Sequence, residues 1–112
     1  MLNQVVLVGR MINEIEVKQN EEGRKQSIIT LAVNRIYKNV DGEYETDMIP
    51  IILWYGIAEN VKEYCKKGDV VGIRGRLQVI DEKLYVIADK VTFLSSKKND
   101  EVDNGKETNK EA

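Results

Sequence analysis

The apolar residues of this chain recur mainly in the short runs and two-residue alternations that are typical of β-strands. Five stretches carry the pattern, and they are rich in the β-branched and aromatic residues that favour extended backbone. They cover residues 5–17, 27–37, 48–55, 70–80 and 84–94. We expect the first stretch to bend near Gly9, because an isolated glycine in a strand often marks a bulge or a close approach of backbones. The pattern therefore predicts five strands.

Polar segments between these stretches have the composition of turns. Asn20–Gly23 separates the first two strands, and Asp41–Gly42 lies at the centre of the second connection. Asp81–Lys83 forms a tight polar turn between the last two strands. The short turns favour antiparallel neighbours.

A single helical pattern follows the third strand. Its apolar members are Ile57, Val61, Tyr64 and Cys65. They fall at i, i+4, i+7 and i+8, which is one face of a helix. Two lysines and Gly68 then supply the cations and the left-handed cap that commonly end a helix. The order matches the OB-fold, an all-β, five-stranded Greek-key barrel with one helix between strands 3 and 4.

Length and charge indicate one domain and an acidic tail. The chain has 112 residues, of which 42% are hydrophobic, enough for a single core. Residues 99–112 carry five acidic and two basic side chains, a net charge of −3, which leaves +1 for residues 1–98. We expect residues 1–96 to form the domain and residues 97–112 to be a disordered tail. A nearly neutral domain does not by itself indicate nucleic-acid binding.

The chain also lacks the signals of membrane insertion and export. No apolar run approaches the roughly 20 residues that span a bilayer. The first residues form no basic leader with a cleavage site, so we expect no signal peptide. Cys65 is the single cysteine, which excludes an internal disulfide and favours the cytoplasm.

Catalytic and metal-binding residues are scarce. The sequence contains no histidine, the usual general base and a common metal ligand. Cys65 lies on the apolar helix stripe, and no glycine loop of the phosphate-binding type is present. The alternating carboxylates are Asp41, Glu43, Glu45 and Asp47. Such a row can suggest a divalent cation, but at a strand end it is typical of a solvated edge. We predict no enzyme activity, no metal and no cofactor.

Several segments, in order and at matching spacing, resemble the bacterial single-stranded DNA-binding protein family from residue 1 to about 94. They read MLNQVVLVGR at the start, ITLAVNR at 29–35, LWYGIAENV at 53–61, YCKKGDVVGIRGRL at 64–77 and VIADKVTFL at 86–94. The resemblance implies non-sequence-specific binding of single-stranded DNA in replication, recombination and repair, at the bacterial nucleoid.

Two aromatic residues match positions at which the family stacks bases. They are Trp54, at the end of the third strand, and Tyr37, at the end of the second. Two-residue alternation places Trp54 opposite the Ile49, Ile51 and Leu53 face that suits the core, hence on the outer face. The alternatives are a Trp54 that plugs one end of the barrel and a Tyr37 that is an ordinary strand-end tyrosine.

The sequence departs from the family pattern in two ways that predict weaker binding. Met48 stands where the family often has Trp or Phe, and methionine offers no flat ring. The turn at Asp81–Lys83 replaces a longer basic loop that carries an aromatic residue. Tyr85 follows that shortened turn, and its alignment to the family is too ambiguous for a role to be assigned.

Basic residues on the predicted strands could follow the DNA backbone. Arg74 and Arg76 share one face of the fourth strand, which suits a path for phosphates. Arg10, Arg35 and Lys38 lie near the ends of the first two strands and could extend that path. The alternative for each of them is a solvated surface charge.

The resemblance further implies a homotetramer, with the first strand contributing to the contacts between subunits. Family tails commonly end in Pro-Phe and recruit replication and repair proteins, whereas this tail ends at residues 109–112 with Asn-Lys-Glu-Ala. We therefore do not expect that recruitment. The acidic tail could instead compete with DNA for the binding surface.

Two other functions remain open from the sequence. An OB-fold can serve as a protein-interaction module, and stacking platforms also accept RNA. The feature that discriminates is whether Trp54 and Tyr37 share an open face with Arg74 and Arg76.

Overall fold

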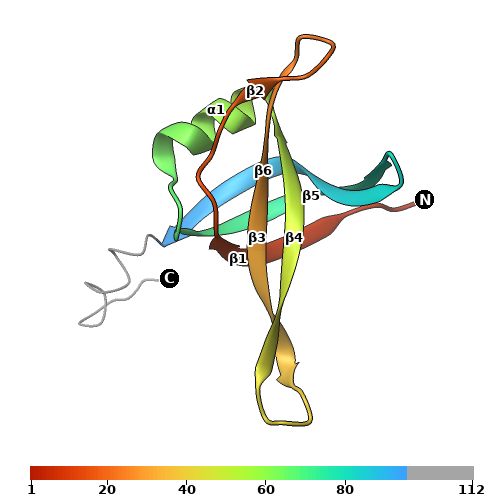
Figure 1. The fold of residues 1–112 in the computed structure, drawn as a ribbon, viewed down its shortest axis with the longest axis vertical. Coiled ribbons are helices and arrows are strands. Elements are labelled where there is room, and N and C mark those ends of the chain that lie inside the picture. The colour runs from red at the N-terminus through yellow and green to blue at the C-terminus, as the bar shows by residue number, and fades with distance from the viewer. Residues whose placement is uncertain (96–112) are drawn as a thin grey trace.

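The computed structural model describes residues 1–95, and most of them lie in strands (Figure 1). The elements are β1 (Val5–Met11), β2 (Lys18–Gln19), β3 (Lys25–Lys38), β4 (Tyr44–Trp54), α1 (Tyr55–Tyr64), β5 (Val70–Ile80) and β6 (Lys83–Ser95). The predicted tail, residues 97–112, lies outside the described residues. Within residues 1–95, no helix is both long and apolar enough to span a bilayer.

The strands form one sheet that curls into a barrel. Its order is β1-β5-β6-β4-β3-β2, and an additional β1–β3 pairing brings the two ends of the barrel sheet together. Within residues 1–95, only the β4–β6 pair is parallel. The predicted class, a five-stranded OB-fold with one helix, is confirmed, and the two-residue β2 is an addition. With β2 counted, the helix lies between β4 and β5.

The first strand is shorter than the sequence predicted. It ends at Met11, and residues 12–17 leave the sheet. The Asn13 side chain explains this, because its Oδ1 accepts the backbone N–H of Thr30 at 2.8 Å. The Thr30 N–H is therefore bonded to a side chain. In a continuing strand it would have been bonded to a backbone carbonyl.

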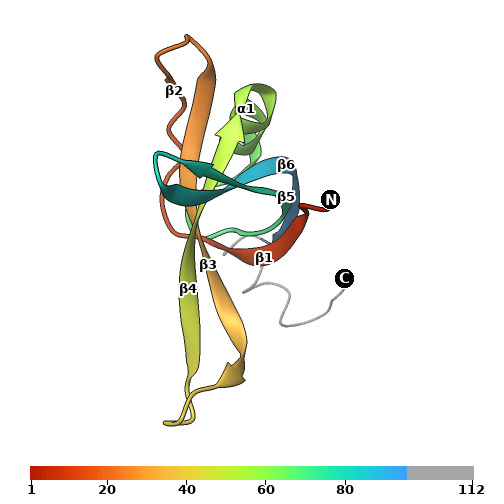
Figure 2. The same ribbon diagram turned by 90° about the vertical axis from the view of Figure 1, so that its right-hand side faces the viewer.

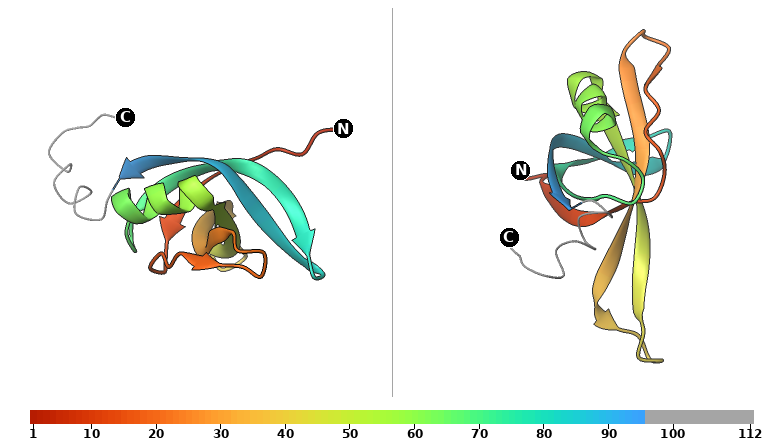
Figure 3. Two further views of the ribbon diagram at one scale, coloured as in Figure 1. Left: turned by 90° about the horizontal axis from the view of Figure 1, so that it is seen from above. Right: turned by 90° about the vertical axis from the view of Figure 1, so that its left-hand side faces the viewer.

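The core lies between the inward faces of the strands and one face of α1. Ile29, Leu31, Ile51 and Leu53 are fully buried in β3 and β4. The predicted helix stripe contributes Val61 and Cys65 to the same cluster, with Ala58 beside them. Figure 3 shows α1 lying across one end of the barrel.

The ends of α1 differ from the prediction. The helix begins at Tyr55, which the sequence assigned to the preceding strand. It ends at Tyr64 with Cys65 in an extended conformation, so Gly68 is not its cap. Gly68 has a φ of 98° in the following turn and donates its N–H to the Met11 carbonyl at 2.8 Å. The Tyr64 ring points outward from the stripe and packs on Phe93, with centroids 5.8 Å apart.

Close backbone contacts explain two strand glycines. A Cβ at Gly9 would lie 2.5 Å from the Ala32 carbonyl oxygen, where β1 crosses β3. At Gly75 it would lie 1.9 Å from the carbonyl oxygen of Ile87. A register shift in the β5–β6 ladder between Arg74 and Gly75 marks the same place. Both positions therefore require glycine for packing.

Candidate nucleic-acid interface

The strand registers define one continuous outer face across β3, β4, β6 and β5. Residues that are directly paired in neighbouring strands point to the same side of a sheet. Ile52 pairs with Ile28 of β3 and with Ile87 of β6, which in turn pairs with Arg76 of β5. We define the outer face by the residues that share the side of this row: Gln26, Ile28, Thr30, Ala32, Met48, Pro50, Ile52, Trp54, Arg74, Arg76, Gln78, Ile80, Lys83, Tyr85, Ile87 and Lys90.

Trp54 is the last residue of β4 and immediately precedes α1. Figure 1 shows these two elements meeting at the upper end of the barrel. Its side chain is half-buried, and it is not a member of the core cluster. Its strand partner is Gln26. Trp54 is therefore partly exposed and lies on the opposite side of β4 from the core residue Leu53.

The centre of the outer face is less exposed than simple alternation indicated. Ile52 and Ile87 are only 3% and 2% exposed, although neither belongs to the core cluster. The parallel pairing of β4 with β6 places these two side chains next to each other. The outer face therefore has an apolar centre, with Trp54 beyond one end and Arg76 beside it.

Arg74 and Arg76 lie together on β5, as predicted, and both are exposed. Arg76 contacts Asp89 at 3.3 Å, with both side chains about half exposed. Arg74 pairs across the ladder with Lys90 of β6, which is also exposed. Sequence reasoning missed Lys90, whose importance depends on the bulge that leaves Asp89 unpaired.

Tyr37 lies near the tip of the β3–β4 hairpin, which projects away from the barrel as a long arm (Figures 1 and 2), whereas Met48 pairs with Ala32 beside the β1–β3 ladder of the barrel. They are 66% and 57% exposed. The ladder shifts register between Asn34 and Lys38, so Tyr37 falls in an irregular segment. Tyr37 is eleven residues along β3 from Gln26, or about 36 Å at the usual strand rise. The structure therefore does not bring Tyr37 close to Trp54.

Arg35 contacts acidic residues of the arm. Its guanidinium lies 2.7 Å from the Glu45 carboxylate and 2.9 Å from that of Asp47. The hydrogen bond from Arg35 holds the pKa of Asp47 below its ordinary value of 3.8. Two of the four residues of the predicted acidic row, Glu45 and Asp47, therefore form ion pairs that link β4 to β3. Among the described residues, no three acidic or cysteine side chains gather as a metal site.

The remaining predicted cations have local contacts. Arg10 donates from Nη1 to the Gly68 carbonyl oxygen, which ties β1 to the turn before β5. Lys38 lies over the Tyr44 ring, with Nζ 5.8 Å from its centroid. Both residues are exposed. Lys38 belongs to the arm, whereas Arg10 pairs with Ala32, the partner of Met48, and so lies on the outer side of the sheet on the neighbouring strand β1.

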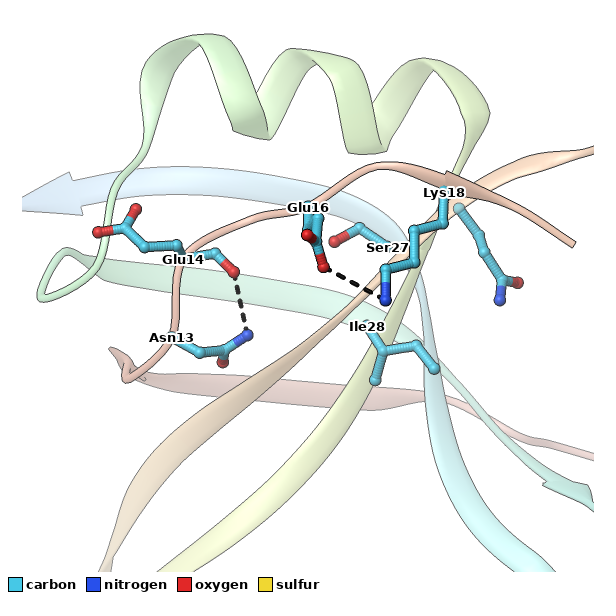
Figure 4. A pocket seen from close by; sticks show the side chains of 7 residues that line it. Asn13, Glu14, Glu16, Lys18, Ser27 and Ile28 are labelled. Atoms are coloured by element: carbon cyan, nitrogen blue, oxygen red, sulfur yellow. Dashed lines mark hydrogen bonds and ion pairs between the residues drawn. The ribbon is translucent and has the colours of Figure 1, made fainter.

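A separate polar pocket lies beneath residues 13–18, at the edge of β3 (Figure 4). Its side chains include the ion pair of Glu16 with Lys18, 3.3 Å apart, and Asn13, which donates to the Glu14 carbonyl oxygen. The Ser27 Oγ is buried here without a hydrogen-bond partner. Two carboxylates and one lysine make this an unfavourable place for phosphate, so we do not include it in the interface.

The family model described as the single-strand binding protein family matches residues 2–94. The chain belongs to this family. It is 41% identical over 108 residues to single-stranded DNA-binding protein 3 of Listeria innocua, covering 88% of this chain and 68% of that one. It is 40% identical over 106 residues to single-stranded DNA-binding protein B of Bacillus subtilis, covering 87% and 94%. The family resemblance predicted from the sequence is thus confirmed.

A solved structure shares the fold. The complex of a Plasmodium falciparum single-stranded DNA-binding protein with single-stranded DNA superposes with a TM-score of 0.70. The similarity covers 85% of this chain and 96% of that chain, at 23% sequence identity. The OB-fold is therefore preserved at low sequence identity.

Proposed function

We propose that this protein binds single-stranded DNA without reading its sequence, by stacking bases on Trp54 and holding phosphates on nearby cations. The observation that supports this most directly is the register that places Trp54, Arg74 and Arg76 on the outer face. A ring beside a path of cations suits unpaired DNA, because every base has a flat face and every nucleotide has a phosphate. The relatives named as single-stranded DNA-binding proteins support the same function.

The protein holds DNA and carries out no reaction on it. The sequence contains no histidine, and burial raises the pKa of the Cys65 thiol to about 11, with a smaller effect from Asp69. The thiol is therefore protonated at neutral pH and is a poor nucleophile. We place this role in the cytoplasm, at the nucleoid, where it protects unpaired DNA during replication, recombination and repair.

The basic residues contribute unequally to this proposal. Arg74 and Lys90 are adjacent across the β5–β6 ladder and form the main phosphate contacts. Arg76 joins them when a phosphate displaces Asp89. Tyr37 and Lys38 extend the surface along the arm, and Met48 adds an apolar contact on the barrel part of β4. Arg35 and Arg10 contribute less, because each already has a contact within the protein.

The same chain assembles through β1, and we propose a homotetramer. Val6 and Val8 point outward from β1 and are 70% and 54% exposed. The β1–β3 ladder includes only Arg10 and Met11 of β1. Between Val5 and Gly9, therefore, the edge of β1 that does not pair with β5 has no strand beside it in the described residues. An exposed edge with an apolar face is suited to pairing with another copy. The domain of residues 1–96 would form this assembly, with residues 97–112 as its acidic tail.

A fluorescence titration of Trp54, the single tryptophan, tests the function. We expect oligo-dT to quench the emission, duplex DNA to leave it unchanged, and added salt to weaken the oligo-dT complex through counterion release. Equal quenching by oligo-rU would extend the substrate to RNA. If emission and gel mobility both stay unchanged with every nucleic acid, the outer face does not bind DNA. The alternative function, a protein-interaction module, would then replace the proposed one.

A further inference from the structure

An apolar groove opens where β4 and β6 separate. Their parallel ladder is limited to two residue pairs, Ile51 with Val86 and Ile52 with Ile87. Beyond it, towards the β5–β6 turn, the strands diverge and leave a groove of about 290 Å³. This volume is at the lower limit for small-ligand pockets, which suits a single flat ring system.

The groove joins the barrel interior to the outer face. Its floor includes core-facing side chains such as Leu7, Ile49 and Val86. Its rim is formed by Met48, Pro50 and Tyr85, all three of which belong to the outer face. The groove is therefore continuous with the surface that carries Trp54 and Arg76.

Tyr85 supplies the ring at this rim. The residue is half-buried and pairs with Gln78 of β5. The Nζ of Lys83 lies 5.6 Å from the Tyr85 ring centroid. Asp81 and Glu82, with φ values of 52° and 68°, form the tight turn between β5 and β6. The pairing of Tyr85 with Gln78 and of the next residue, Val86, with Ile51 fixes Tyr85 beside β4.

We propose that this groove is a nucleobase subsite of the single-stranded DNA site, with Tyr85 stacking on the base and Lys83 contacting the adjoining phosphate. The proposal rests on the proposed function. In this proposal Tyr85 supplies the aromatic ring for stacking at a rim where Met48 has none. Asp81 and Glu82 offset the charge of Lys83, so stacking rather than charge provides the affinity of this subsite.

The registers also define the path of the strand between the two rings. Since Ile52 pairs with Ile87 in parallel, Pro50 and Tyr85, each two residues earlier in its strand, are level with each other. Trp54 is four residues from Pro50, or about 13 Å along β4. A DNA strand that stacks on Trp54 must therefore continue along β4, across the buried Ile52 and Ile87, to reach the groove.

The test compares oligo-dT binding to the full chain and to Tyr85→Leu, which keeps apolar bulk but removes the ring. We expect Tyr85→Leu to weaken binding by about fivefold or more, the lower end of the range known for base stacking in proteins of this fold. The dependence of affinity on salt should stay unchanged. Tyr85→Phe should bind as the natural protein does. Tyr64→Leu, which removes an exposed ring of α1, is the matched control and should also bind normally.

The outcomes separate this inference from the function itself. If the natural protein binds no oligo-dT, the proposed function fails. If it binds and Tyr85→Leu binds equally well, the subsite is wrong. Should Tyr85→Leu unfold, photo-crosslinking of the natural protein to 5-iodouridine DNA decides, since an adduct on Tyr85 supports the subsite and its absence contradicts it. A change in sedimentation mass of Tyr85→Leu would mean that the groove holds a second copy instead.

Discussion

The ion pair between Arg76 and Asp89 places a carboxylate where the proposed function requires a phosphate. The Arg76 Nη1 lies 3.3 Å from the Asp89 Oδ1, and the two side chains are 45% and 52% exposed. A phosphate that takes over this contact must displace Asp89. Asp89→Asn removes the competing charge and keeps the size of the side chain. We therefore expect this substitution to tighten the binding of single-stranded DNA.

The magnitude follows from the exposure of the pair. Exposed ion pairs contribute about 0.2–1 kcal/mol. The displacement of Asp89 costs about this amount, so Asp89→Asn should lower the Kd by up to about fivefold, given that 1.4 kcal/mol is a factor of ten. Arg76→Gln should weaken binding and reduce the slope of log K against log salt by about 0.7, the value for one phosphate contact on a single strand.

A double-mutant cycle measured by oligo-dT titration at several salt concentrations tests this reasoning. In the Arg76→Gln background, Asp89→Asn should have a smaller effect, because the two residues act through one contact. Glu63→Gln makes the same charge change at an exposed position of α1 and is the control. Unchanged or weaker binding by Asp89→Asn, or a gain equal to that of Glu63→Gln, would refute the proposed role of Arg76.

Three further predictions concern the ring, the assembly and the arm. Trp54→Ala should weaken binding of a fluorescein-labelled oligo-dT by about 1–3 kcal/mol, the range known for this fold, while circular dichroism still shows a cooperative melt; loss of the melt would assign Trp54 to the core. Val6→Glu should reduce the sedimentation mass, and an unchanged mass would exclude this face of β1 from the assembly. The lowered pKa of Asp47 stabilises the fold above the unfolded value of 3.8, and this contribution is lost as the pH falls through the folded pKa. Asp47→Asn should therefore be less stable than the natural protein at pH 7 in urea titrations, and this difference should shrink as the pH is lowered towards 2, whereas an equal difference at both values would contradict the sign.

The sequence alone was sufficient for the class of fold and the family. Alternating apolar residues predicted the strand at 70–80, which matches β5, and the helix stripe predicted the burial of Val61 and Cys65. These features depend on neighbours within a few residues, so local periodicity records them. The outward direction of Trp54 also followed from alternation within one strand.

Only the tertiary structure decided what lies beside each of these side chains. The burial of Ile52 depends on Ile87, which is far away in sequence and becomes a neighbour through the β4–β6 ladder. The same ladder brings Tyr85 to the rim with Met48, and the β5–β6 bulge places Lys90 opposite Arg74. Likewise, Asn13 ends the first strand through a hydrogen bond to Thr30 that no local pattern records. Strand periodicity determines the face on which a residue lies, whereas the register between strands determines its partners, and register depends on the packing of the whole barrel.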